Sequence, residues 1–104
     1  MTHVSEILSF DGFVNFIGEN KRAIIFYGSP DCEACTELKN IYERIANRYH
    51  KRIAFGYTNI KESELKIQYI PMFVSFYKKE EINKIIGADK HRLKNFIKEA
   101  ILQK

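Results

Sequence analysis

The sequence predicts an α/β domain in which helices cover both faces of a central mixed sheet, a three-layer α/β/α sandwich. Apolar runs typical of strands alternate with amphipathic stretches, in the order β-α-β-α-β-α-β-β-α. Such alternation is typical of a parallel sheet, and the closing pair of adjacent strands adds an antiparallel edge. At 104 residues the chain has the usual length of one domain, so we expect residues 1–104 to fold as a unit.

The first half of the chain contains the strongest strand signal. Residues 23–27 form a continuous β-branched and aromatic run, which is typical of a strand covered on both faces. Before it we expect a short strand over 4–8 and a helix over 10–17 with Ser9 or Asp11 as its cap. After it, apolar residues recur at helical spacing from Glu33 to Tyr49.

The second half predicts three more strands and two helices. We expect a half-buried strand over 53–57, a short, weak helix over Lys61–Gln68 and a buried strand over 72–77. A polar turn at Lys79-Glu80 then leads into an edge strand over 82–86. Asp89 is expected to cap a final helix that turns its apolar residues from Leu93 to Ile101 toward the core.

Composition excludes some function classes. No stretch approaches the roughly 18 apolar residues of a membrane span, and no signal peptide is visible, so we expect a cytoplasmic protein. The net charge of +4 comes from residues 78–104, which hold eight basic and four acidic residues. We expect these lysines to be a solvated helix face. A nucleic acid partner is not expected, because no aromatic residue is interleaved with Lys90, Lys94 and Lys98.

Cys32 and Cys35 are the only cysteines, and their spacing predicts redox or metal chemistry rather than a structural disulfide. They lie where the buried strand meets the amphipathic helix. The start of a helix presents free backbone N–H groups and the positive end of its dipole, which favour a thiolate at Cys32. Cys35 lies one turn later on the same face, within reach to close a disulfide. Zinc is not expected, because the three histidines lack ligand spacing.

Together these features resemble the thioredoxin family. The active-site loop of that family is matched by Ser29-Pro30-Asp31-Cys32-Glu33-Ala34-Cys35, its cis-proline loop by Tyr69-Ile70-Pro71-Met72, and a glycine–alanine pair by Gly87-Ala88. The resemblance implies that Cys32 attacks and Cys35 resolves. It also implies that Pro71 is in cis beside the disulfide, and that the backbone of Ile70 pairs with an extended substrate. Pro30 and Asp31 complete the substrate contacts that it implies.

Three departures from the family pattern bear on the chemistry. Asp31 stands where a tryptophan is usual, so Asp31 and Glu33 place negative charge beside Cys32 and tune its reactivity. Phe26 and Tyr57 stand where many members carry a buried acid and its lysine partner, which suggests slow resolution of the mixed disulfide. The dipeptide Glu33-Ala34 lacks the histidine of more oxidising members, which favours a reductant.

We therefore expect a monomeric protein-disulfide reductase with no bound cofactor or metal. Its expected partners are protein disulfides and an electron donor, either a thioredoxin-reductase-type enzyme or a glutathione-linked system. Two alternatives stay open at this point. One is a non-catalytic binding module with a thioredoxin fold, and the other is a glutaredoxin-like, glutathione-dependent oxidoreductase.

Overall fold

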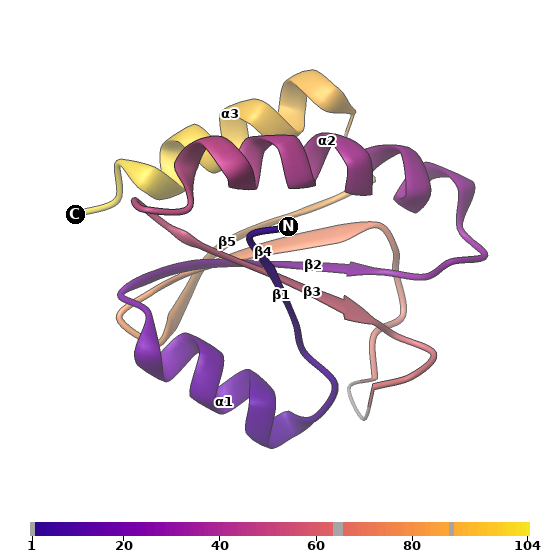
Figure 1. The fold of residues 1–104 in the computed structure, drawn as a ribbon, viewed down its shortest axis with the longest axis horizontal. Helices are drawn as coiled ribbons and strands as arrows, with labels where there is room; N and C mark the ends of the chain where they lie inside the picture. The colour runs from indigo at the N-terminus through magenta and orange to yellow at the C-terminus, as the bar shows by residue number, and fades with distance from the viewer. Residues whose placement is uncertain (1, 64–65, 88) are drawn as a thin grey trace.

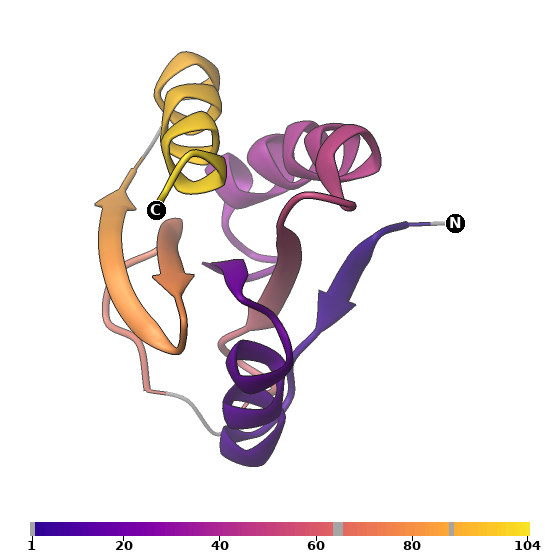
Figure 2. The same ribbon diagram turned by 90° about the vertical axis from the view of Figure 1, so that its left-hand side faces the viewer.

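Three helices cover the two faces of one sheet (Figure 1). The computed structural model describes residues 2–63, 66–87 and 89–104. Helix α1 (Phe10–Glu19) lies on one face, and helices α2 (Glu33–Tyr49) and α3 (Lys90–Ile101) lie side by side on the other, as Figure 2 also shows. The predicted three-layer α/β/α sandwich is therefore confirmed.

The sheet has five strands in the order β1-β3-β2-β4-β5. The parallel part consists of β1 (Val4–Glu6), β3 (Ala54–Asn59) and β2 (Arg22–Gly28). The antiparallel part adds β4 (Met72–Tyr77) beside β2, and then β5 (Glu80–Ile86). Strand β2 is thus central, with Phe26 opposite Tyr57 on one side and opposite Phe73 on the other.

Alternate residues of β2 pack into two different apolar cores, as the sequence predicts for a strand covered on both faces. Ile24 and Phe26 join the core under α2 and α3, whereas Ile25 and Tyr27 join the core under α1. Each fully buried large apolar side chain contributes about 1.5–3 kcal/mol. The hydroxyl of Tyr42 fixes α2 to the sheet, because it donates to the carbonyl oxygens of Gly56 at 2.7 Å and Ile24 at 3.2 Å.

The predicted helix over Lys61–Gln68 is wrong for the residues that the structure describes. Residues 61–63 form a turn and residues 66–68 have no regular structure, while 64 and 65 lie outside the described residues. Asn59 supports only this one turn: its carbonyl oxygen accepts hydrogen bonds from the N–H groups of Glu62 (3.0 Å) and Ser63 (3.1 Å). The chain must then cross to β4, and extended backbone covers about twice the distance per residue that a helix does.

The turn between β4 and β5 lies one residue earlier than expected. Lys78 and Lys79 form it, with φ angles of 50° and 73°, and Tyr77 pairs with Glu80. A two-residue hairpin turn with two positive φ angles matches the right-handed twist of the strands. Strand β5 therefore starts at Glu80 rather than at Ile82.

Hydrogen bonds from capping side chains fix the starts of two helices. Ser9, rather than Asp11, caps α1, because its Oγ accepts from the N–H of Gly12 at 3.0 Å. The predicted cap of α3 is confirmed, since Asp89 Oδ1 accepts from the N–H of Arg92 at 2.8 Å. Of the pair Gly87-Ala88, Gly87 has a φ of +65°, and Ala88 lies outside the described residues.

Candidate active site

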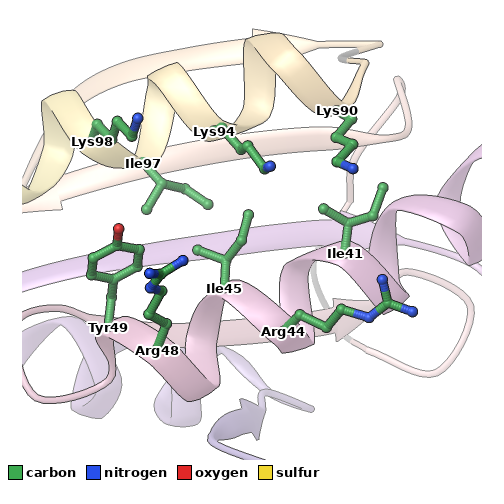
Figure 3. Close-up of a pocket in the computed structure, with 9 residues that line it drawn as sticks. All are labelled: Ile41, Arg44, Ile45, Arg48, Tyr49, Lys90, Lys94, Ile97 and Lys98. Atoms are coloured by element: carbon green, nitrogen blue, oxygen red, sulfur yellow. The ribbon is translucent and has the colours of Figure 1, made fainter.

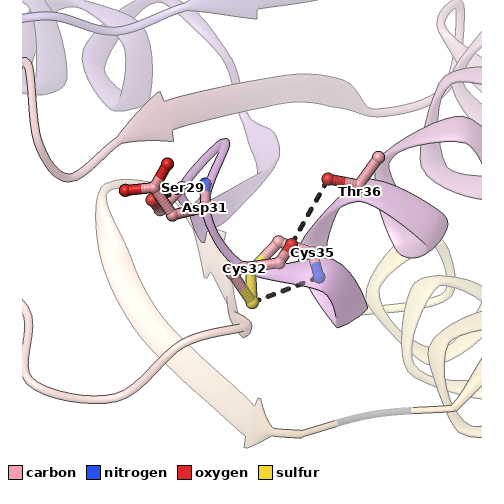
Figure 4. Close-up of a disulfide and its surroundings, with 5 residues drawn as sticks. All are labelled: Ser29, Asp31, Cys32, Cys35 and Thr36. Atoms are coloured by element: carbon pink, nitrogen blue, oxygen red, sulfur yellow. Dashed lines mark hydrogen bonds between the residues drawn. A yellow bond between two sulfur atoms is a disulfide. The ribbon is translucent and has the colours of Figure 1, made fainter.

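The two cysteines lie where the central strand β2 leads into helix α2 (Figure 4). Gly28 ends the strand, and a Cβ there would lie 3.3 Å from the Cβ of Cys35. A glycine therefore allows the start of the helix to settle directly on the end of the strand. Buried Ser29 then turns the chain. Its Oγ accepts a hydrogen bond from the N–H of Asp31 at 3.2 Å, and its carbonyl oxygen accepts one from the N–H of Cys32 at 3.2 Å.

Cys32 is the N-cap residue of α2. Its Sγ accepts a hydrogen bond from the N–H of Cys35 at 3.2 Å, and its carbonyl oxygen accepts from the N–H of Thr36 at 3.1 Å. The hydroxyl of Thr36 donates to the same carbonyl oxygen at 3.3 Å. An N–H donor and the positive end of the helix dipole thus meet at the Cys32 sulfur, and both stabilise negative charge there.

The pair forms a disulfide, with its Cα atoms 5.1 Å apart. Its two members differ in access to solvent. The Cys35 side chain is buried, with 2% of its surface exposed, whereas Cys32 is only partly buried. Cys32 can therefore meet a partner molecule, and Cys35 is positioned to react with Cys32 rather than with the partner.

The acidic residues near the cysteines lie at the surface. Asp31 and Glu33 are exposed, with 69% of the Asp31 side chain open to solvent. Asp31 forms an ion pair with Lys61, from the turn after β3. Sequence reasoning missed Lys61, because a contact between residues thirty positions apart leaves no local signal. The positive charge of Lys61 counters the negative charge that the sequence places beside Cys32.

The proline loop lies at the same end of the sheet. Tyr27 pairs with Met72, so Pro71 lies level with the end of β2 where the cysteine loop begins. The Ile70–Pro71 peptide bond is cis, and Pro71 is buried. Its carbonyl oxygen accepts from the N–H of Gly87 at 2.8 Å. Ile70 is half-buried, next to a largely exposed Tyr69.

An aromatic cluster occupies the positions where the resemblance implies a buried acid and a lysine. Phe26 is fully buried, and its ring lies edge-on to the rings of Tyr42 at 5.3 Å and Tyr57 at 5.2 Å. Burial raises the pKa of Tyr57, and Glu6 and Glu62 raise it further. The Tyr57 phenol is therefore neutral at physiological pH. Neither Phe26 nor Tyr57 can accept a proton from Cys35.

A hollow of about 250 Å³ opens beside Cys35, between the start of α2 and the end of β3. Its other lining residues are Ser29, Pro30, Thr36, Lys39, Asn40 and Tyr57. Lys39 lies one turn after Cys35 on α2, and its Nζ lies 4.3 Å from the centre of the Tyr57 ring. We did not single out Lys39 from the sequence, although its i+4 spacing from Cys35 was the available signal.

Elsewhere in the described part of the chain, no three histidine, cysteine, aspartate or glutamate side chains gather as a metal site would require. His3 stacks on His50 with ring centres 3.6 Å apart, and His91 lies on α3 beside Asn95. None of the helices in the described residues is both long enough and apolar enough to cross a membrane.

Comparison with known proteins identifies the family. The family model described as Thioredoxin matches residues 4–99, nearly the whole chain. The chain belongs to the thioredoxin family. Within curated proteins, it is 26% identical over 96 residues to a thioredoxin of Malassezia sympodialis, covering 86% of this chain and 91% of that protein. It is also 28% identical over 74 residues to Thioredoxin-like 3-3 of Arabidopsis thaliana, covering 68% of this chain and 58% of that protein.

Solved thioredoxin structures share the fold. The crystal structure of the Malassezia sympodialis thioredoxin superimposes with a TM-score of 0.86 at 24% identity, covering 97% of this chain and 93% of that one. A Plasmodium falciparum thioredoxin superimposes with a TM-score of 0.84 at 21% identity, covering 91% of this chain and 97% of that one. Family membership and a cysteine pair at disulfide distance together support thiol–disulfide oxidoreductase function in this thioredoxin-family protein.

Proposed function

We propose that the protein reduces disulfide bonds in other proteins. The observation that carries this proposal is the unequal exposure of the two cysteines: Cys32 is partly exposed at the helix start, and Cys35 is buried. Efficient reduction needs one thiolate that meets the substrate and a second that is withheld until the first has reacted. The arrangement of this pair meets both needs.

The reaction has two exchange steps. The Cys32 thiolate attacks one sulfur of the substrate disulfide, forms a mixed disulfide and expels the other substrate sulfur as a thiolate, which takes a proton from water. The Cys35 thiolate then attacks Cys32 Sγ and expels the second substrate sulfur. Two electrons pass to the substrate, and the Cys32–Cys35 disulfide seen in the structure is the oxidised product.

Substrate binding is assigned to the surface around Cys32. Pro30 and Asp31 are exposed on one side of it, and Ile70 and Pro71 belong to the loop at the same end of the sheet. The backbone of Ile70 would pair with an extended substrate segment as a short added strand, which leaves selection to the side chains nearby. The exposed ring of Tyr69 supports this assignment, because it extends the apolar surface of the loop.

The reaction requires an external source of electrons, either a thioredoxin-reductase-type enzyme or a glutathione-linked system. We place the protein in the cytoplasm as a monomer that maintains the thiol balance of the cell. The cysteine content supports the cytoplasmic placement. Structural disulfides are rare in reducing compartments, and the only two cysteines of this chain belong to the redox pair. A reduction potential of about −120 mV for the cysteine pair, typical of a strong oxidant, would contradict the proposal that the protein reduces its substrates.

Reduction of insulin by dithiothreitol tests the proposal, with Cys32→Ser and Cys35→Ser as matched variants. We expect turnover in the wild type and none in either variant. Cys35→Ser should accumulate a mixed disulfide with insulin, whereas Cys32→Ser should form none. Equal trapping by both variants would overturn the roles given to the two cysteines. No turnover by a folded wild type would favour a non-catalytic binding module, and turnover only with glutathione would favour a glutaredoxin-like activity.

A further inference from the structure

A groove runs between helices α2 and α3, on the outer side of the layer that they form (Figure 3). It has a volume of about 270 Å³. Its floor is apolar, formed by Ile41 and Ile45 from α2 and by Ile97 from α3, with Tyr49 at one end. Ile97 and Ile45 are buried, and Ile41 and Tyr49 are half-buried, so the last two offer apolar surface to a ligand.

Five cations form the rims of this groove. Arg44 and Arg48 stand on α2, and Lys90, Lys94 and Lys98 stand on α3. All five are exposed, and along each helix they recur every four residues, which keeps them on one face. Figure 3 shows the two rows on opposite sides of the isoleucines. The lysine row extends over about 12 Å at the helical rise of 1.5 Å per residue.

These five residues carry more positive charge than the net charge of +4 of the whole protein. The chain has 17 lysines and arginines and 13 acids, so without these five it would carry one more acid than base. No acid lines the groove, and in the described residues none of the five cations forms an ion pair. The charge is therefore unneutralised and faces a partner from both sides of a concave surface, which strengthens its field.

We propose that this groove binds an acidic protein segment that carries aliphatic side chains among its carboxylates. The carboxylates would meet the two rows of cations, and the aliphatic side chains would lie on Ile41, Tyr49 and the alkyl stems of the lysines. A nucleic acid strand fits less well, because Tyr49 is the one aromatic residue lining the groove and base stacking needs several. A flat membrane surface would reach the rims but not the floor.

The groove lies apart from the redox site. It shares no lining residue with the hollow beside Cys35, although both involve α2. Binding there goes beyond disulfide reduction, and the two activities can be measured separately. Binding there would also give a role to Lys90, Lys94 and Lys98, which were expected from the sequence to form only a solvated helix face.

The test measures binding of a fluorescein-labelled amphipathic peptide to the full-length protein by fluorescence anisotropy. The probe has about 14 residues, long enough to form a helix, with leucine at positions i, i+3, i+4 and i+7 and glutamate elsewhere. We expect saturable binding that weakens as salt rises. The double variant Arg44→Glu/Lys94→Glu should bind at least about tenfold more weakly, because two attractive contacts become repulsive.

A matched variant controls for net charge. Lys21→Glu/Lys84→Glu changes the charge by the same amount at two exposed positions outside the groove, so its affinity should stay within about twofold of the wild type. Both double variants should reduce insulin as the wild type does. Equal weakening by both would overturn the groove as the binding site, since it would indicate attraction to overall charge.

Three further probes address the class of partner. A peptide with glutamine in place of each leucine should bind at least about tenfold more weakly. Equal affinity would remove the apolar floor from the proposal. Tighter binding of an oligothymidine strand, or of vesicles rich in anionic lipid, with the same sensitivity to Arg44→Glu/Lys94→Glu, would replace the acidic protein segment by a nucleic acid or a membrane.

Discussion

Lys39 is the residue best placed to compensate for the missing buried acid beside Cys35. Its ammonium group lies over the Tyr57 ring, and both residues line the hollow that Cys35 also borders. A nearby cation stabilises a thiolate, so Lys39 can favour the ionised resolving cysteine without accepting its proton. Solvent in the hollow can take that proton instead.

We expect Lys39→Met to slow resolution of the mixed disulfide by about two- to fivefold at neutral pH, the range for a partly screened charge pair. The measurement follows release of thionitrobenzoate from an adduct at Cys32. Lys39→Arg keeps the charge and should retain the wild-type rate. Unchanged release in Lys39→Met would show that its charge plays no part in resolution.

Thr58 carries a polar atom that the fold leaves unsatisfied. Its side chain is fully buried, and its hydroxyl has no hydrogen-bond partner in the described part of the chain. Valine has the same shape without the hydroxyl. We expect Thr58→Val to stabilise the protein by about 1 kcal/mol, raising Tm by about 4–8 °C in thermal unfolding.

The control for this change is Thr58→Ala, which removes the hydroxyl and also a methyl group. Because it leaves a small void, it should be less stable than Thr58→Val by about 1 kcal/mol. A fall in Tm with Thr58→Val would mean that the hydroxyl is hydrogen-bonded in solution.

At the scale of elements, the β4–β5 hairpin contains a strained turn. Lys78 and Lys79 both adopt positive φ angles, where a side chain with a Cβ is disfavoured by about 1–2 kcal/mol. Asparagine followed by glycine is the preferred pair for such a turn. We expect Lys78→Asn/Lys79→Gly to raise the free energy of unfolding by about 1 kcal/mol, measured by urea titration. This net gain is smaller than the strain that is removed, because the added glycine also increases the entropy of the unfolded chain.

A glycine elsewhere in the same hairpin provides the contrast. Lys84→Gly lies within β5, where the backbone is extended, and should lower the free energy of unfolding by about 0.5–1 kcal/mol. A loss of stability in the turn variant as well would show that the lysine side chains contribute more than their backbone strain costs.

Helices and strands with a clear apolar period could be predicted from the sequence, and segments fixed by tertiary contacts could not. The buried run in β2 and the amphipathic face of α2 each have a strong local signal, so the position of Cys32 at their junction followed directly. The segment after Asn59 has only a weak local signal. Its path depends on where β4 begins, and no local sequence pattern indicates that position. The Asp31–Lys61 pair and the α2–α3 groove arise from the same long-range packing.

At the scale of the whole molecule, buried tyrosines tie stability to alkaline pH. Burial, together with Glu81, raises the pKa of Tyr27 to about 12, and burial raises the pKa of Tyr42 well above its ordinary value. In the unfolded chain both phenols ionise near pH 10. The unfolded state therefore releases protons first, so the stabilising effect is complete below about pH 10. The part that Tyr27 contributes is lost as the pH rises through about 12.

We expect Tyr27→Phe to reduce this alkaline loss of stability by about 2 kcal/mol between about pH 10 and pH 12, because phenylalanine cannot ionise. Urea unfolding at a series of pH values gives the profile. Tyr69→Phe, at an exposed position, is the matched control and should follow the wild type. Parallel profiles for Tyr27→Phe and the wild type would show that Tyr27 ionises equally in both states.

Helix α2 connects the two sites of this protein as a single rigid body. Its first turn holds the cysteine pair, and its later turns form one wall of the basic groove, all within 17 residues or about 25 Å. A protein tethered through an acidic segment in the groove would keep its own disulfides close to Cys32. The tether would raise their effective concentration, so a substrate with low affinity for the cysteine loop would still react quickly.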